Sequence, residues 1–266
     1  MSGPDEGANA VRLSVGDGVA RVIFNRPQSL NAIDVETAEG FLAAVEELLT
    51  RDDVRVIVLA GVGRAFMAGG DLAAFHASSD PQALASAIII PLHRALQRLA
   101  EAPQLVLGSV HGAVSGAGMS LAMGCDMTLA AADARFCLAY AGIGASLDGG
   151  GSWHLLRQLG LQRAMQLALL NEVLSAEQAQ QLGLIARVVA PERLDEETGA
   201  LAARLARGPA IAQGRIKRLL RQAGNSSLAD QLAAEHDAFR ACAGSADFRE
   251  GIAAFFAKRR PVYQGR

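Results

Sequence analysis

The chain has 266 residues, 51% of them hydrophobic, and this amount of apolar material can fill one full-sized core. Its formal net charge of -2, from 25 basic and 27 acidic residues, gives no electrostatic basis for binding nucleic acid or an anionic membrane. An apolar stretch at residues 83–92 is far too short to span a bilayer. Residues 1–10 are polar and lack the apolar region of a secretory signal. We therefore expect a cytoplasmic protein with neither nucleic acid nor membrane as a partner.

The cysteines and histidines show no pattern typical of a metal site. The three cysteines are widely spaced and form no Cys-x-x-Cys pair, which suits a reducing compartment and argues against a disulfide framework. The five histidines include no His-Glu-x-x-His run. We expect no protein-bound catalytic metal.

The first sixty residues predict a hairpin, a helix and a buried strand. Residues 11–15 and 19–25 alternate apolar and polar side chains around an Asp-Gly turn, which is typical of a β-hairpin. Asp34 is placed to cap a helix whose apolar residues recur at helical spacing. The nearly continuous apolar run at residues 54–60 indicates a strand that is covered on both faces.

Helices and strands then alternate, which predicts an α/β fold with a parallel sheet. Beyond Gly149 the pattern is helical, apart from a strand at residues 185–189, and a capping-box sequence starts at Ser175. We expect an α/β core over residues 1–195 and a helical segment over residues 196–266. The alternating elements are a helix at residues 81–100, a strand at 105–110, a short helix at 117–124 and a strand at 127–131.

Three glycine-rich segments, residues 61–72, 111–120 and 142–153, accompany transitions from strand to helix. Backbone N–H groups at such transitions can point toward an anion. None of the segments fits the dinucleotide fingerprint, the phosphate-binding loop or the Gly-x-Ser-x-Gly nucleophile elbow, so a serine hydrolase is only a weak alternative. Taken singly, each could be an ordinary tight turn.

Taken together, five motifs in order resemble the crotonase (enoyl-CoA hydratase/isomerase) family over nearly the whole chain. The resemblance implies a β-β-α spiral core with a C-terminal helical segment that assembles trimers or dimers of trimers. It also implies an acyl-CoA thioester as the substrate, with no cofactor besides the CoA that the substrate carries. The matching motifs are residues 25–32, 65–72, 111–126, 175–185 and 255–261.

The resemblance also assigns roles to individual residues. The backbone amides of Gly70 and Ala117 would form an oxyanion hole for the thioester oxygen. Each preorganised donor that faces such a developing charge contributes about 3 kcal/mol to lowering the barrier. Lys258 would reach CoA from a neighbouring subunit. The substrate and CoA contacts implied by the family are Arg26, Leu30, Ala32, Ala68, Gly69, Asp71, Leu72, Gly118, Tyr140 and Lys258.

The candidate base distinguishes the reactions of the family. Its hydratases use two glutamates, and Ser120 and Tyr140 stand at those positions here. Asp148 matches the aspartate of the family's ring-epoxide and enoyl-CoA isomerases of phenylacetate catabolism, and also the nucleophile of 4-chlorobenzoyl-CoA dehalogenase. We therefore predict an isomerase with Asp148 as its single base.

Several alternatives stay open. A hydratase, hydrolase or dehalogenase-like enzyme could use Asp148, or the protein could bind CoA without catalysis. Asp148 could instead cap a helix at residues 149–152, as we expect Asp71 to cap the short helix after it. We expect His111 to bond a backbone carbonyl and Asp126 to anchor a turn.

Overall fold

The N-terminal hairpin forms as predicted. The structure, a computed structural model, describes residues 9–266, so most of the polar stretch at residues 1–10 that bears on secretion lies outside it. Strands β1 (Val11–Gly16) and β2 (Val19–Phe24) pair antiparallel. Asp17 and Gly18 join them at φ 52° and 78°, the left-handed backbone that a two-residue hairpin turn needs.

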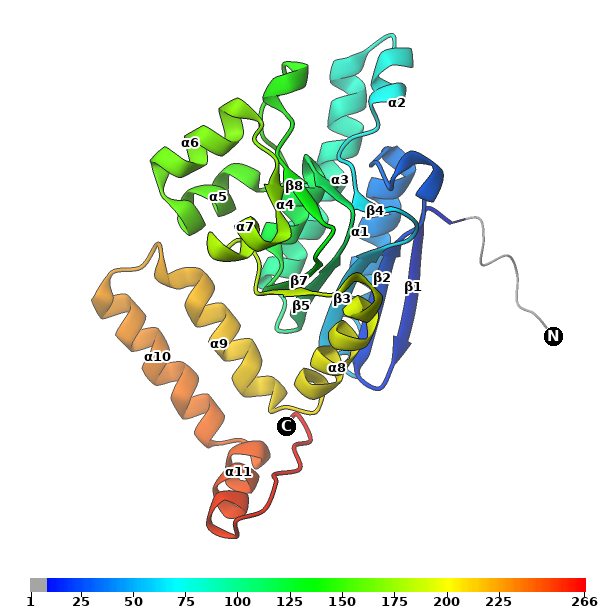
Figure 1. Ribbon diagram of the computed structural model, residues 1–266. Helices are drawn as coiled ribbons and strands as arrows, with labels where there is room; N and C mark the ends of the chain where they lie inside the picture. Colours follow the sequence, from blue (N-terminus) through cyan, green and yellow to red (C-terminus); the bar gives the residue numbers. More distant parts are fainter. Residues whose placement is uncertain (1–8) are drawn as a thin grey trace, which may run out of the picture.

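A six-stranded main sheet has the order β1-β2-β3-β5-β7-β10. Every pair from β2 to β10 is parallel, which confirms the predicted parallel sheet. Figure 1 shows this sheet at the centre of the molecule, with helices around it. The strands not yet bounded are β3 (Val56–Gly61), β5 (Leu105–Val110), β7 (Met127–Ala131) and β10 (Arg187–Val189).

Both faces of the main sheet are covered by helices. The side chains of β3 show this, since they alternate between two different hydrophobic cores. Ile57 and Leu59 belong to the large core, together with helices α1 (Val35–Leu49) and α3 (Pro81–Glu101). Val56 and Val58 pack instead against helix α8 (Leu194–Ala206) on the other face. The predicted cap of α1 is present, since the Asp34 side chain accepts a hydrogen bond from the Thr37 amide.

Helix α8 contains the boundary that we expected after residue 195. Ala202 and Ala206 of this helix are buried against the main sheet. Because α8 packs with the core, the helices that stand apart begin only at α9 (Ala210–Ala223). The division of the chain into two domains stays a prediction.

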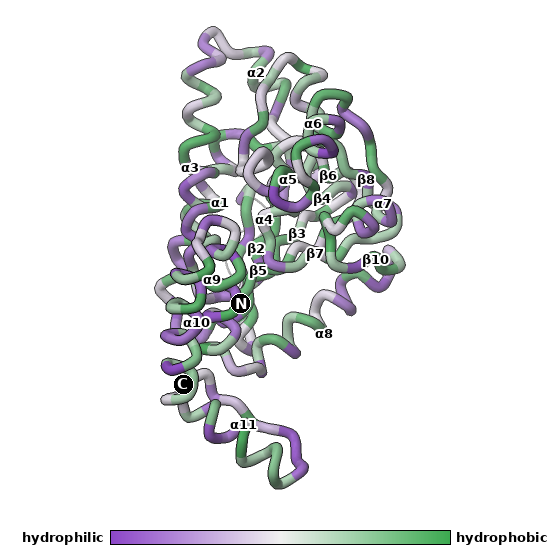
Figure 2. The backbone as a smooth tube through the Cα atoms, turned by 90° about the vertical axis from the view of Figure 1, so that its left-hand side faces the viewer, coloured by the Kyte–Doolittle hydropathy of each residue, from purple (hydrophilic) through white to green (hydrophobic). Residues whose placement is uncertain are grey.

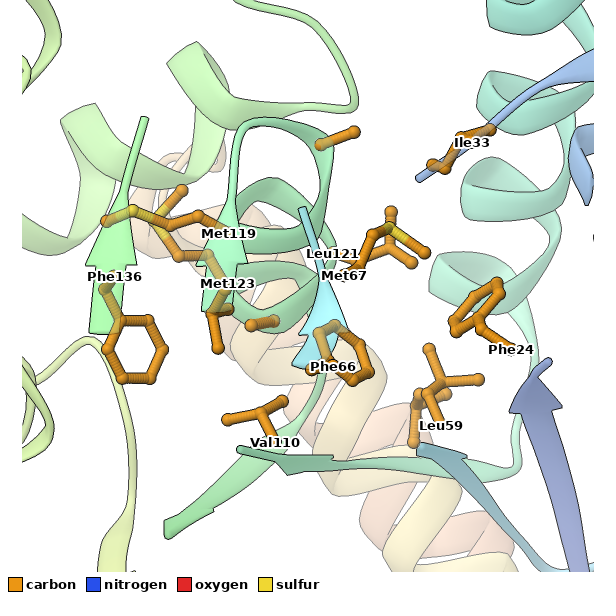
Figure 3. Packing of buried hydrophobic residues seen from close by; sticks show 14 of the residues in the cluster. Phe24, Ile33, Leu59, Phe66, Met67, Val110, Met119, Leu121, Met123 and Phe136 are labelled. Carbon is orange, nitrogen blue, oxygen red and sulfur yellow. The ribbon is translucent and has the colours of Figure 1, made fainter. Parts of the chain in front are cut away.

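A second, four-stranded sheet lies against the main one, with the order β4-β6-β8-β9. Figure 3 shows Phe66 and Met67 of β4 in the same apolar cluster as Leu59 of β3 and Val110 of β5. Sequence patterns did not predict these strands, because each has only two or three residues and forms by pairing with distant segments. The strands are β4 (Ala65–Met67), β6 (Ala113–Ser115), β8 (Arg135–Cys137) and β9 (Leu174–Ser175).

Short helices connect and cover the second sheet. Helix α4 (Ala117–Gly124) follows β6 and is buried over residues 117–123, and Figure 2 shows it within the hydrophobic centre. Helix α7 (Ala176–Gln181) has Ser175 as its N-cap, with the predicted capping box. The remaining short helices of the chain are α2 (Leu72–Ala77), α5 (Gly151–Leu159), α6 (Leu161–Leu170) and the 3-10 turns η1 (Pro27–Ser29), η2 (Ala141–Ile143) and η3 (Pro191–Arg193).

Helices α9, α10 (Leu228–Ala243) and α11 (Ala246–Phe256) extend away from the sheets. Asp126 joins α9 to the core through ion pairs with Lys217 (3.1 Å) and Arg221 (2.6 Å), and it also accepts a hydrogen bond from the Val106 amide. Its predicted anchoring role is confirmed. Figures 1 and 2 place α11 at the opposite end of the molecule from α2. Over residues 9–266, no helix combines the length and apolar character needed to cross a membrane.

Candidate active site

Two predicted oxyanion segments, distant in sequence, meet in space. A Cβ built on Gly69, just after β4, would lie 3.3 Å from Ser115 O and 3.8 Å from Ala117 N at the start of α4. Gly69 has φ 104° and Gly116 has φ 53°, and such backbone strongly favours glycine. The two glycines therefore allow the two chain segments to lie against each other.

The amides of Gly70 and Ala117 are free at this junction. Ile33 N donates to Gly69 O (2.7 Å) and Asp71 N donates to Ile33 O (2.9 Å), but within residues 9–266 neither Gly70 N nor Ala117 N donates a hydrogen bond. Ala117 also opens helix α4, where the first amides have no acceptor in the helix and the helix dipole is positive. These features suit the binding of an anion.

Asp148 lies in a cluster with Tyr140 and Ser120. The Tyr140 hydroxyl donates a hydrogen bond to Oδ1 of Asp148, and the Ser120 Oγ lies 3.3 Å from the same hydroxyl. Ser120 is three residues after Ala117 in α4, so about 4.5 Å of helix rise separates this member of the cluster from Ala117. Burial, and after it the negative charge of Asp148, raises the pKa of Tyr140 above its ordinary value, so this tyrosine stays a donor.

The turn that carries Asp148 is held by a histidine that the sequence analysis missed. Gly149 N donates to Nε2 of His93 in α3 at 3.0 Å, and Gly151 N donates to Asp148 O at 2.8 Å. His93 is 56 residues from Gly149 and belongs to no motif, so no sequence signal pointed to it. This bond requires an unprotonated Nε2 on His93.

The idea that Asp148 caps the next helix is wrong. Helix α5 has Gly150 as its N-cap and no side-chain cap bond. The Asp148 side chain accepts a hydrogen bond from Tyr140 instead. It thus has no structural role in starting α5.

The predicted contacts of the first segment lie side by side. Ala68 N donates to Leu30 O at 3.0 Å, and Ile33 and Gly70 form a parallel bridge, so residues 30–33 run along residues 68–71. Ala32 is buried and Leu72 is exposed at the start of α2. Gly118 is buried, and a Cβ there would clash with Met67 O, which explains the close packing of α4 on β4.

Arg26, predicted to contact CoA, is bonded within the protein. Its guanidinium donates to Ala32 O (2.6 Å) and lies 3.0 Å from the carboxylates of both Asp34 and Asp71. Asp71 also caps α2 as expected, by accepting from Ala73 N and Ala74 N. The contact between Arg26 and a CoA phosphate stays a prediction. It requires the guanidinium to bind the phosphate while it is also paired with Asp34 and Asp71.

Two further candidates lie outside this cluster. Lys258 follows α11, a helix at the opposite end of the molecule from α2 in Figure 1, and its predicted contact with CoA of a neighbouring subunit stays a prediction. His111 Nε2 lies 3.0 Å from Gly63 O, which confirms its predicted bond to a backbone carbonyl. In the described part of the chain, no three His, Cys, Asp or Glu side chains gather as metal ligands.

Comparison with known proteins gives consistent results over the whole length. Residues 14–266 match the family described as enoyl-CoA hydratase/isomerase. The chain is 38% identical to a 1,2-epoxyphenylacetyl-CoA isomerase of Escherichia coli (strain K12), covering 95% of this chain and 97% of that protein. It is 36% identical to a "probable enoyl-CoA hydratase" of Rhodobacter capsulatus, covering 97% and 99%. The crystal structure of an enoyl-CoA hydratase from Polaromonas sp. JS666 superposes with a TM-score of 0.91 at 32% identity, covering 96% and 99%.

Proposed function

Because the chain belongs to the enoyl-CoA hydratase/isomerase family and has the crotonase fold, we propose that it is an acyl-CoA isomerase with Asp148 as its single base. The observation that carries this proposal is that α4 connects the junction of the two free amides, through its residue Ser120 and then Tyr140, to one carboxylate. Asp148 accepts a hydrogen bond from Tyr140, whose hydroxyl lies 3.3 Å from Ser120 Oγ, and Ser120 stands about one helical turn after Ala117 in α4.

The geometry supports a proton transfer through an enolate. For a 3-enoyl thioester, Asp148 takes the proton from C2, the electron pair moves onto the thioester oxygen, and the amides of Gly70 and Ala117 receive that charge. Each such donor lowers the barrier by about 3 kcal/mol. The double bond then forms between C2 and C3, and the proton passes from Asp148 to C4. No atom is gained or lost.

A second carboxylate is what the ordinary hydratase mechanism requires. The two side chains at the positions of the hydratase glutamates, Ser120 and Tyr140, are hydroxyls; Ser120 bonds Tyr140, and Tyr140 bonds Asp148. A hydroxyl with the raised pKa of Tyr140 cannot take a proton from water at neutral pH. This favours isomerisation over hydration, and hydration or hydrolysis through Asp148 is the second candidate.

The substrate acyl group is proposed from the relatives. The 38% identity to a 1,2-epoxyphenylacetyl-CoA isomerase supports an aromatic-derived ring substrate, with a linear enoyl-CoA as the alternative. Neither choice changes the role of the amides, because both substrates present a thioester oxygen.

We also propose the trimeric assembly implied by the family. Large apolar side chains are exposed on the C-terminal helices, including Leu220 (73%), Leu228 (75%), Phe255 (78%) and Phe256 (80%). Large apolar side chains left exposed in this number are typical of a subunit interface. Sedimentation equilibrium tests the assembly, and a monomer at micromolar concentration would contradict it.

The function is tested by product analysis with wild type and Asp148→Asn. We expect the wild type to isomerise a 3-enoyl-CoA or 1,2-epoxyphenylacetyl-CoA, as followed by NMR, and to hydrate a 2-enoyl-CoA far more slowly. Asparagine keeps the size of the side chain but cannot accept the proton, so we expect a loss of about 100-fold or more. Isomerisation that survives in Asp148→Asn, or hydration as the main reaction, would overturn the proposal.

A further inference from the structure

Tyr140 has no separate role in the mechanism above, although its side chain hydrogen-bonds the proposed base. Tyr140 as a whole residue is 8% exposed, and its hydroxyl lies between Ser120 Oγ and Asp148 Oδ1. A tyrosine that lined the acyl pocket would keep its hydroxyl for the substrate or for solvent. Here both of its hydrogen-bonding directions are used within the protein.

We propose that Tyr140 is a positioning residue: its hydroxyl, backed by Ser120, holds Oδ1 of Asp148, so that the proton shuttle runs through Oδ2 alone. This inference deepens the proposed function and rests on it, because it requires Asp148 to be the base.

The direction of the Tyr140 bond follows from charge and burial. A carboxylate can only accept hydrogen bonds, so the tyrosine donates its proton to Oδ1. The tyrosine oxygen is then left to accept from Ser120, which gives a chain from Ser120 through Tyr140 to Asp148. Buried hydrogen bonds to a charged group are among the stronger ones in proteins.

Fixing Oδ1 has a consequence for the fate of the proton. In the first half-reaction, the C2–H bond breaks and an Oδ2–H bond forms. Because Oδ1 is held by Tyr140, the carboxyl group cannot rotate and carry the Oδ2–H group away from the substrate to exchange with water. In the second half-reaction, the Oδ2–H bond breaks and the C4–H bond forms, so the proton that leaves C2 is the one delivered to C4.

The variant that tests the inference is Tyr140→Phe, which removes only the hydroxyl. The chain has two tyrosines, so Tyr263→Phe is a matched control in the C-terminal tail. We expect Tyr140→Phe to lower kcat roughly tenfold or more, as the loss of a bond to a charged group predicts, with KM changed less than about twofold. We also expect more deuterium from D2O in the product per turnover. Tyr263→Phe should change neither quantity.

A structural or substrate-binding role for Tyr140 predicts different results. A raised KM with unchanged kcat would show that the hydroxyl binds substrate, and would overturn the inference. A lowered kcat with unchanged deuterium content would show loss of structure alone, and would overturn it too. If Asp148→Asn keeps its activity, Asp148 is not the base and the proposed function itself is refuted. If Asp148→Asn loses activity but Tyr140→Phe has normal kinetics, only the positioning role of Tyr140 is refuted.

An optical titration measures the bond independently of activity. Tyr263→Phe leaves Tyr140 as the single tyrosine, whose ionisation is followed at 295 nm. If Asp148 holds the Tyr140 proton, adding Asp148→Asn makes tyrosinate appear at a lower pH, with circular dichroism confirming that the chain is folded. An unchanged titration curve would overturn the inference.

Discussion

The Tyr140 hydroxyl and the Asp148 carboxylate are hydrogen-bonded across a loop that separates them by eight residues in sequence. The backbone of the same loop closes on Tyr140, whose carbonyl accepts from Ala145 N at 3.0 Å. The side-chain bond therefore joins the end of the loop that carries the proposed base to its buried start. Both the pH dependence of stability and the activity follow from this arrangement.

Stability should fall in alkali because of Tyr140. Its pKa is raised in the folded state, chiefly by burial, above the unfolded value of 10. Above pH 10 the unfolded chain loses this proton while the folded chain keeps it, so the free energy of unfolding decreases by up to about 1.4 kcal/mol per pH unit. Urea unfolding of the wild type and Tyr140→Phe between pH 9 and 11 measures the slope, which should be shallower in the variant. Equal slopes would contradict the burial of a neutral Tyr140.

His93 should be needed to hold the turn that carries Asp148. In His93→Leu, the buried Gly149 amide loses its acceptor, which should cost about 1–3 kcal/mol of unfolding free energy. The activity should fall as well, because the turn that presents Asp148 is released. His93→Gln is the matched control, since its side-chain carbonyl can accept the same bond. Urea unfolding and kcat are the measurements, and a His93→Leu protein as stable and active as wild type would show that this bond is dispensable.

Gly116 should tolerate no side chain. Its backbone has φ 53° and ψ -123°, and a Cβ there would lie 3.3 Å from Gly69 Cα. Gly116→Ala should cost about 1–3 kcal/mol in backbone strain and shift the Ala117 amide, so kcat should fall with it. Gly183→Ala is the control, because Gly183 also has a positive φ (78°) but nothing lies within 4 Å of its Cβ position. If both variants keep full kcat, the junction of the two segments does not form the oxyanion hole.

His154 should make the protein sensitive to acid. Burial, and then the charges of Arg221 and Arg157, lowers its pKa to about 4. Between the ordinary value of 6.5 and pH 4, the unfolded chain binds a proton that the folded chain does not, so stability falls as the pH falls, by up to about 1.4 kcal/mol per pH unit. His154→Gln should flatten the profile of unfolding free energy in this window. The exposed His236, changed to Gln, is the control.

Local features were predicted correctly from the sequence. The hairpin turn at Asp17, the cap at Asp34 and the capping box at Ser175 depend on neighbouring residues, so their physical signals lie within a few positions. The parallel sheet followed from the alternation of strand and helix. In contrast, β4, β6, β8 and β9 carry no local signal, because pairing between distant segments forms them.

The candidate site was only partly predictable. The glycine segments and Asp148 came from motifs and from the family resemblance, and the structure places the two glycine segments together. The partners of these residues were missed. Nothing in the sequence links Tyr140 to Asp148 by a hydrogen bond, His93 to the Gly149 amide or Arg26 to two carboxylates, since each contact depends on the tertiary fold.

A crystal structure of the protein with a bound 3-enoyl-CoA analogue, in which a methylene prevents turnover, tests the central claim most directly. We predict that the thioester carbonyl oxygen lies about 3 Å from both Gly70 N and Ala117 N, as hydrogen bonds to an oxyanion require. Oδ2 of Asp148 should face C2 while Oδ1 keeps its bond to Tyr140. A carbonyl oxygen bound away from the two amides, or an Asp148 carboxylate turned away from C2, would contradict the account.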